Sequence, residues 1–341
     1  MKIAIIVRKL NVKGGTQRQS LHLARELKKM GHEVTLYTFL YSPEQCYGEL
    51  LQGLRVVSLE RYPSSGFLFF QEYAVAKELS QMIDSQTDLL NPHDQVSYRV
   101  ASYMKRRVRN IPSVWMMNDL PTKTFSLARR AELDPQFKPS LMQTIGAAIG
   151  DWYEGRRFIR DQDRITVLDE RDKKWLQEYF GKEAIVVRSG IDIEQFSYAE
   201  RKPISGKRIT ILMAGIFFSH RRFEDGIYAL KILYDSGYDA HMTIVGEYQG
   251  NQSYYQSLCK LCGNLGVSDR IVFTGKISDS DLTSSYRSHD IFLFPNHLQS
   301  WGLAVFEAMA SGCPVIVSKT AGASEVLTDG ENALLVPPKN P

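Results

Sequence analysis

The sequence predicts an α/β protein made of two Rossmann-like, doubly wound domains that face a cleft. Short β-branched runs alternate with amphipathic helical stretches along nearly the whole chain. The alternation stops at a polar segment, residues 192–207, and then restarts. The length of 341 residues also corresponds to two domains at roughly 150 residues each. We therefore place the domains at residues 1–195 and 196–341.

The chain opens with a strand–loop–helix–strand unit. Ile3–Val7 is a continuous apolar run of the kind found in buried parallel strands. A loop containing Gly14 and Gly15 follows, and Thr16 is predicted to cap the first helix. The next strand is predicted over Glu33–Tyr37. Parallel strands joined by a helix imply helices on both faces of the sheet.

The rest of the first domain follows the same two periodicities. Further strands are predicted over residues 56–59, 89–90, 113–117, 165–168 and 185–187, and helices over 73–82, 96–107 and 173–179. Residues 121–163 are less regular, helical in places, and are expected to decorate the sheet. The polar segment 192–207, which contains Pro203 and Gly206, is predicted to be the linker.

The second domain repeats the alternation with six strands. They are predicted over residues 209–213, 241–245, 271–273, 291–294, 315–318 and 333–336. The intervening helices are predicted over residues 224–236, 254–265, 280–288 and 303–311. Six strands with helical crossovers indicate a second doubly wound sheet, with ligands expected at the carboxyl ends of its strands.

Composition and charge exclude several classes of protein. Hydrophobic residues make up 43% and charged residues 23%, as in folded soluble domains. The net charge of +4 does not favour a nucleic-acid binder. No export signal is visible, so a cytoplasmic location is expected. Cys259 and Cys262 form a C-x-x-C pair without the second pair that a zinc site needs, so we expect reduced thiols.

The loop with Gly14 and Gly15 has two interpretations. Its glycines let a backbone approach a phosphate at the helix N-terminus, or they form a plain turn. The loop does not favour a nicotinamide dehydrogenase, because the third glycine of G-x-G-x-x-G is missing. The second strand also ends without the carboxylate that such enzymes use to bind ribose.

The segment from Phe294 to Pro338 contains the most specific pattern. A strand ends at Phe294, a helix begins at Gly302 and Leu303, and Glu307 follows one turn later. The neighbours of Glu307 in this helix are nearly all apolar, which favours a ligand role over a solvated carboxylate.

This pattern resembles the donor-binding signature of the retaining glycosyltransferases of family 4, which have the two-domain GT-B fold. The signature is a glutamate, seven residues, and a second glutamate, with Gly-Leu between them. The glycine loop at Gly14, the stretch Asn91–Asp94 and the stretch Arg188–Asp192 also resemble this family. The similarity covers almost the whole chain in order.

The resemblance implies a nucleotide-sugar site. The N–H groups of Gly302 and Leu303 would bind the diphosphate, and Glu307 would bind the ribose hydroxyls. The base would lie near Gly246 and Lys276. The implied donor-binding residues are Gly14, Gly15, Gly215, Arg221, Arg222, Gly246, Lys276, Gly302, Leu303 and Glu307.

Two positions depart from the family pattern. Gln299 stands where the first glutamate of the signature is expected, and an amide cannot place a full charge beside a developing oxocarbenium ion. Ile216 replaces the basic residue expected after Gly215. Arg222 retains the second basic position and can clamp a diphosphate, with Arg221 beside it, unless the pair is merely solvated.

The resemblance assigns catalytic positions to His93 and Gln299. The histidine would contact the transferred sugar, although a lone histidine is often structural. Asn118 and Asp119 end another predicted strand and are assigned to the acceptor side.

The implied activity is retaining transfer of a sugar from a nucleotide-diphosphate sugar to an acceptor hydroxyl. It would need no cofactor and no metal, because N–H groups and Arg222 stabilise the leaving group. The acceptor would be a saccharide or a lipid-linked saccharide, in cell-envelope or capsular polysaccharide synthesis. The alternatives are a weakly catalytic nucleotide-sugar-binding partner protein, suggested by Gln299, and a GT-B epimerase or phosphorylase.

Basic clusters at residues 105–109 and 156–160 fit peripheral contact with the inner face of the cell membrane, or solvated helix faces. Relatives usually continue past Pro338 into a helix that returns to the first domain. We therefore expect this sequence to lack that helix and to have a looser cleft.

Overall fold

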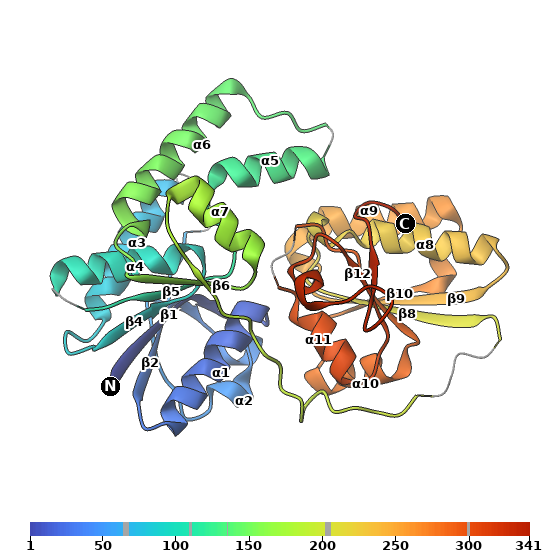
Figure 1. The fold of residues 1–341 in the computed structure, drawn as a ribbon, viewed down its shortest axis with the longest axis horizontal. Coiled ribbons are helices and arrows are strands. Elements are labelled where there is room, and N and C mark those ends of the chain that lie inside the picture. The colour runs from blue at the N-terminus through green and yellow to red at the C-terminus, as the bar shows by residue number, and fades with distance from the viewer. Residues whose placement is uncertain (64–67, 109–110, 135, 202–205, 299–300) are drawn as a thin grey trace. The chain divides into compact units, whose positions relative to one another are not determined.

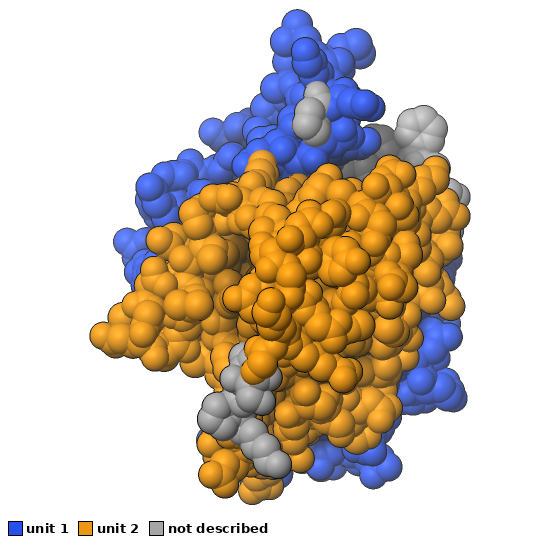
Figure 2. All heavy atoms as spheres, turned by 90° about the vertical axis from the view of Figure 1, so that its right-hand side faces the viewer, with its two compact units in different colours: residues 1–188 blue, residues 189–341 orange. Residues whose placement is uncertain are grey.

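The computed structural model describes residues 1–63, 68–108, 111–134, 136–201, 206–298 and 301–341. They form two compact units, residues 1–188 and 189–341, which Figure 2 distinguishes by colour. The predicted boundary after residue 195 lies just inside the second unit. Trp301 Nε1 donates to the Ser189 carbonyl over 2.7 Å, and Phe196 is buried in the core of this unit. Within the predicted linker, Phe196 therefore belongs to the core of the second unit.

The first unit contains parallel strands in the order β3-β2-β1-β4, followed by β5-β6-β7. Isolated parallel bridges between Leu90 and Ser113, and between His93 and Met116, connect the two groups. The strands are β1 (Lys2–Leu10), β2 (Glu33–Tyr41), β3 (Arg55–Ser58), β4 (Leu89–Pro92), β5 (Val114–Met117), β6 (Arg164–Val167) and β7 (Ile185–Val186). The predicted strands of this domain are confirmed.

Seven α-helices accompany this sheet within the described residues. They are α1 (Gly15–Lys29), α2 (Gly48–Leu51), α3 (Leu68–Met82), α4 (Asp94–Arg107), α5 (Lys123–Leu133), α6 (Leu141–Glu154) and α7 (Glu170–Phe180). The predicted cap of α1 was wrong. Gly14 is the N-cap, and the Thr16 hydroxyl instead accepts a hydrogen bond from Asn118 Nδ2 over 3.1 Å. The Thr16 oxygen that would cap the helix is instead the acceptor of a tertiary hydrogen bond from Asn118.

Helices α5 and α6 form a hairpin that projects from the sheet of the first unit (Figure 1). The buried Asp151 of α6 accepts hydrogen bonds from the N–H groups of Lys123 and Thr124 over 2.7 and 3.0 Å, and so caps the start of α5. Glu154, at the end of α6, forms an ion pair with Arg99 of α4 over 2.9 Å. Arg99 also pairs with Glu72 of α3 over 2.8 Å. The base of the hairpin is thus held by a buried polar network.

The second unit is one six-stranded parallel sheet in the order β10-β9-β8-β11-β12-β13. Its strands are β8 (Arg208–Ala214), β9 (Asp239–Val245), β10 (Ile271–Gly275), β11 (Ile291–Phe294), β12 (Val315–Ser318) and β13 (Leu334–Val336). Its helices are α8 (Phe223–Asp235), α9 (Gln252–Leu265), α10 (Asp279–Ser288) and α11 (Leu303–Ala310). This is the doubly wound order, and its direction reverses between β8 and β11, where such sheets bind ligands.

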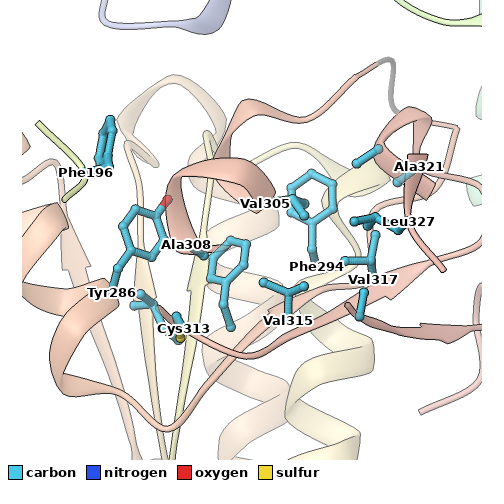
Figure 3. Packing of buried hydrophobic residues seen from close by; sticks show 14 of the residues in the cluster. Phe196, Tyr286, Phe294, Val305, Ala308, Cys313, Val315, Val317, Ala321 and Leu327 are labelled. Atoms are coloured by element: carbon cyan, nitrogen blue, oxygen red, sulfur yellow. The ribbon is translucent and has the colours of Figure 1, made fainter. Parts of the chain in front are cut away.

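The core beside β11 and β12 positions α11. Val305 and Ala308 of α11 are buried against Phe294, Val315 and Val317 of these strands (Figure 3). Burial of these apolar side chains holds the short helix on the sheet. Its N-terminus therefore lies at the carboxyl edge of the sheet.

Candidate functional site

Hydrogen bonds join the loops after β8 and β11 at the point where the strand order reverses. With the Asn296 amide oriented by its partners, its nitrogen donates to the Arg221 carbonyl over 3.1 Å. Its oxygen accepts from Arg221 Nη1 over 2.8 Å. The N–H of His297 donates to the His220 carbonyl over 2.8 Å. These bonds fix a guanidinium at the carboxyl edge of the sheet.

Gly215 and Gly246 bring the loops after β8 and β9 into unusually close contact. A β-carbon on Gly246 would lie 1.8 Å from the Gly215 carbonyl oxygen. A β-carbon on Gly215 would lie 3.2 Å from Arg221 Nε, so that side chain covers the glycine. The Gly246 N–H donates to the Gly275 carbonyl over 3.1 Å, and the exposed Lys276 follows directly. Gly215, Arg221, Gly246 and Lys276 therefore lie along one edge.

Arg222 is held by carboxylates of its own helix. It has a left-handed backbone at φ 55° and caps α8. Its guanidinium pairs with Asp225 over 2.5 and 2.9 Å and with Glu224 over 2.7 Å. A diphosphate at this position would have to share the guanidinium with two carboxylates. The i, i+3 spacing of Arg222 and Asp225 could have revealed this pairing in the sequence.

The turn into α11 requires a glycine. Gly302 has φ 96°, and a β-carbon there would lie 2.9 Å from the Phe294 ring. Leu303 is the first helical residue. The first N–H groups of a helix have no intrahelical acceptors, and the helix dipole makes this end attractive to anions. This turn thus allows backbone N–H groups to bind a phosphate.

Glu307 is buried, with 5% of its surface exposed, so it is not a solvated helix residue. Its Oε2 accepts a hydrogen bond from the Tyr286 hydroxyl over 3.1 Å. Tyr286 lies in α10 and directs this hydroxyl toward α11 (Figure 3). The bond fixes the orientation of the carboxylate one turn into α11.

In the first unit, the predicted residues lie at the carboxyl ends of β1, β4 and β5. Gly14 and Gly15 open α1 after β1, and Gly14 has an ordinary extended backbone at φ −146°. Thr16, in the first turn of α1, binds Asn118 as described above. Asp119 is exposed beside it. The glycine loop and the predicted acceptor residues therefore occupy one edge of this sheet.

His93 is fully buried at the end of β4, and its backbone N–H donates to the Ile6 carbonyl over 2.8 Å. Its Nε2 lies 2.9 Å from Asn91 Oδ1. Asn91 Nδ2 donates to the Val114 carbonyl over 2.7 Å, which fixes the amide and identifies Nε2 as the protonated nitrogen. Burial lowers the pKa of His93 to about 4. The neutral ring leaves Nδ1 as an acceptor with no partner among the described residues.

The structure thus groups the predicted residues into two sets, one at the carboxyl edge of each sheet. Gln299 lies outside the described residues. The sequence analysis missed Asn91, Tyr286 and Asn296, each of which orients a predicted residue. Asn91 and Asn296 each follow an apolar run, and a polar residue at the end of a predicted strand could have identified them as site residues. No sequence pattern could have identified Tyr286, because its role depends on the packing of two helices.

Within the described residues, no three His, Cys, Asp or Glu side chains group closely enough to hold a metal ion. Cys259, Cys262 and Cys313 form no disulfide, and burial raises the pKa of Cys262 to about 11, so its thiol is not activated. No helix in the described ranges combines the length and the apolar composition needed to cross a membrane.

Family models match both halves of the chain. Residues 13–195 match the model described as Glycosyltransferase Family 4, and residues 194–341 match that of glycosyl transferases group 1. The chain is 26% identical to phosphatidyl-myo-inositol mannosyltransferase of Mycobacterium leprae, over 96% of this chain and 80% of the relative. It is 24% identical to mannosylfructose-phosphate synthase of Agrobacterium fabrum, over 95% and 75%.

Solved structures show the same fold. Anabaena HepE in complex with UDP and glucose has a TM-score of 0.75 at 18% identity, over all of this chain and 86% of that one. Sucrose-phosphate synthase of Thermosynechococcus elongatus has a TM-score of 0.76 at 17% identity, over 99% and 86%. The predicted fold class, two Rossmann-like domains of the GT-B type, is confirmed.

Proposed function

The chain belongs to Glycosyltransferase Family 4, and we propose that it moves a sugar from a nucleotide-diphosphate sugar to an acceptor hydroxyl with retention of the anomeric configuration. The arrangement at the carboxyl edge of the second sheet gives the main support. Arg221, fixed by Asn296, and the N-terminus of α11 present positive charge and N–H groups on adjacent loops. This is the chemistry that a diphosphate needs.

The donor has further support from the comparisons. Solved structures of HepE contain UDP and UDP-glucose. In this chain we propose that the buried Glu307, oriented by Tyr286, accepts hydrogen bonds from the ribose hydroxyls. The base would lie beside Gly246 and Lys276, where the close contact with Gly215 leaves no room for a side chain on Gly246.

In the proposed reaction, the acceptor hydroxyl oxygen attacks the anomeric carbon, the bond from that carbon to the diphosphate oxygen breaks, and the proton of the hydroxyl passes to the departing diphosphate. The N–H groups of Gly302 and Leu303, with Arg221 and Arg222, stabilise the negative charge on the leaving diphosphate. We propose that this charge stabilisation requires no metal. His93 Nδ1 would accept a hydrogen bond from a sugar hydroxyl, which requires movement of the groups that bury the ring.

We further propose that the acceptor is a saccharide or a lipid-linked saccharide, used in cell-envelope or capsular glycoconjugate synthesis at the inner membrane face. The curated relatives support a polyol or sugar acceptor, since they include a phosphatidyl-myo-inositol mannosyltransferase. Asn118 and Asp119, at the edge of the first sheet, would line the acceptor side together with Gly14 and Gly15.

The decisive experiment is a panel of nucleotide sugars tested by thermal shift and then by donor turnover with product stereochemistry. Stabilisation by UDP- or GDP-sugars with release of the nucleotide and an unchanged anomeric configuration supports the proposal. Failure of both nucleoside diphosphates to stabilise the protein contradicts it.

A weakly catalytic nucleotide-sugar-binding protein is the second candidate, because Gln299 stands at the position of a glutamate. Gln299→Glu separates the two candidates. Under the second candidate, the wild-type protein binds a donor without turning it over, and the glutamate variant gains activity. Turnover by the wild type at a rate that the substitution does not raise would exclude this candidate.

A further inference from the structure

Helix α6 presents a broad apolar face to solvent. Its exposed large hydrophobic side chains are Leu141, Met142, Ile145, Ile149, Trp152 and Tyr153. At about 100° per residue these six positions fall within an arc of about 120° on the helix. The opposite side of α6 packs inward through Ala147, Gly150, Asp151 and Glu154. The helix is therefore apolar on its outer face, and Asp151 and Glu154 lie on the face that packs against the rest of the first unit.

The apolar face ends at a basic pocket. An open pocket of about 610 Å³ is lined at this end of α6 by Trp152, Arg156 and Arg160, and on the other side by Phe180 and Lys182. Arg156 lies over the Trp152 ring at 5.0 Å. Neither Arg156 nor Arg160 forms an ion pair within the described part of the chain. The lining carboxylate, Asp151, is occupied by the start of α5.

The order of residue types along α6 and the helical turn that follows it matches an anionic membrane surface. Aliphatic side chains come first, then Trp152 and Tyr153, then Arg156 and Arg160. The apolar face runs about 16 Å along the helix axis from Leu141 to Trp152, which is long enough for the helix to lie in the interfacial layer. Aromatic rings favour the interface and arginines favour the phosphate level. The two arginines with Lys182 provide the charge complementary to an anionic headgroup.

We propose that α6 is the membrane-docking element of the protein. Its apolar face enters the interfacial layer of an anionic membrane, and a lipid phosphate binds in the pocket formed by Arg156, Arg160 and Lys182. This inference rests on the proposed location at a membrane, and it is independent of the proposed transfer reaction. It also identifies the apolar surface that must accompany the basic cluster at residues 156–160, since charge alone gives only weak membrane attachment.

The test is co-sedimentation of the full chain with vesicles made of equal parts phosphatidylcholine and phosphatidylglycerol, compared with phosphatidylcholine alone. Wild type should bind the mixed vesicles and bind the neutral ones much more weakly. Ile145→Gln with Ile149→Gln should weaken binding at least about ten-fold. Arg156→Gln with Arg160→Gln should do the same. Because Ile145 and Ile149 are 51% and 61% exposed, the substitutions should leave folding intact.

The matched control is Ile232→Gln in α8, whose side chain is 53% exposed and lies outside the proposed surface. It should bind vesicles like wild type. Equal binding to both kinds of vesicle, or unchanged binding by both α6 variants, would overturn the proposal. Sedimentation velocity adds a separate outcome. Suppose that the wild type binds no vesicles but forms a dimer, and that the variant with Ile145→Gln and Ile149→Gln is a monomer. The partner of the apolar face would then be a second copy of the chain.

Stabilisation of the same variants by UDP or GDP is measured separately. Variants that lose vesicle binding while keeping nucleotide binding support the docking element. Failure of wild type to bind nucleotide, with vesicle binding intact, would contradict the proposed function alone.

Discussion

Gly215 and Gly246 approach so closely that a β-carbon on Gly246 would lie 1.8 Å from the Gly215 carbonyl oxygen. The glycines directly follow the neighbouring strands β8 and β9, so their contact shapes the edge at which we place the nucleotide. A side chain on Gly246 would push these loops apart, and the effect can be measured.

Gly246→Ala should destabilise the protein by more than about 4 kcal/mol, because a backbone atom blocks the new methyl group and cannot rotate away. The measurement is thermal or urea unfolding. Gly263→Ala in α9 is the control, since nothing lies within 4 Å of its added β-carbon. It should stabilise the helix by about 0.5–1 kcal/mol. Equal stability of the two variants would show that the strand ends do not meet as described.

Glu307→Ala should weaken binding of the nucleoside diphosphate about ten-fold or more, because a carboxylate that accepts from ribose hydroxyls is worth about 1.5–3 kcal/mol. Isothermal titration calorimetry measures the change. Tyr286→Phe removes the hydroxyl that orients Glu307 and should have a smaller effect in the same direction. The exposed Glu331→Ala serves as the control. Wild-type affinity in Glu307→Ala would remove this residue from the donor site.

Arg221→Gln should reduce affinity for UDP or GDP about ten-fold, and the loss should shrink as salt concentration rises. The guanidinium is fixed by Asn296, so it meets a diphosphate with little loss of entropy. Arg222→Gln should additionally lower the melting temperature, because it leaves Glu224 and Asp225 without their cation.

Arg270→Gln is the control for both arginine variants. Arg270 pairs with Asp239 at the start of β9, away from the carboxyl edge. A comparable loss of nucleotide affinity in this variant would mean that the effect is general electrostatics and not a specific contact.

His93 should make the protein sensitive to acid. Burial lowers its pKa to about 4, below the ordinary value of 6.5, so between these values the unfolded chain binds a proton that the folded chain does not. The contribution of neutral His93 to the free energy of unfolding is therefore complete above about pH 6.5. It is lost as the pH falls toward 4, by on the order of 3 kcal/mol.

Urea unfolding across this pH range measures the effect. His93→Gln should remove this part of the pH dependence, whereas His241→Gln, on β9, should retain it. An unchanged slope in His93→Gln would show that its imidazole titrates normally and is not buried in neutral form.

The fold was predictable from local patterns. Runs such as Ile3–Val7 are buried on both faces of a parallel sheet, so their composition alone identifies them as strands. The predictions were wrong where a contact with a residue distant in the sequence determines the role of a side chain. Thr16 has the composition of a cap, yet its hydroxyl binds Asn118. Phe196 lies in a polar segment, yet it packs against Tyr286 in the core of the second unit.

The sequence was sufficient to predict which residues belong to the site, but not the contacts that orient their side chains. Gly302 and Glu307 follow from a pattern near one strand end, but the hydrogen bond from Tyr286 depends on how α10 packs against α11. The outer face of α6 escaped prediction for a different reason. Ile145 and Ile149 have the spacing of core residues, and only the structure shows that the inward face is formed by Asp151 and Glu154 instead.

The ion pair between Glu154 and Arg99 has a mechanical consequence. Helix α4 starts directly after His93 and includes Arg99, so the imidazole and the projecting hairpin are attached to the same rigid rod. A displacement of the hairpin at this ion pair would therefore be carried by α4 toward the segment that holds the ring.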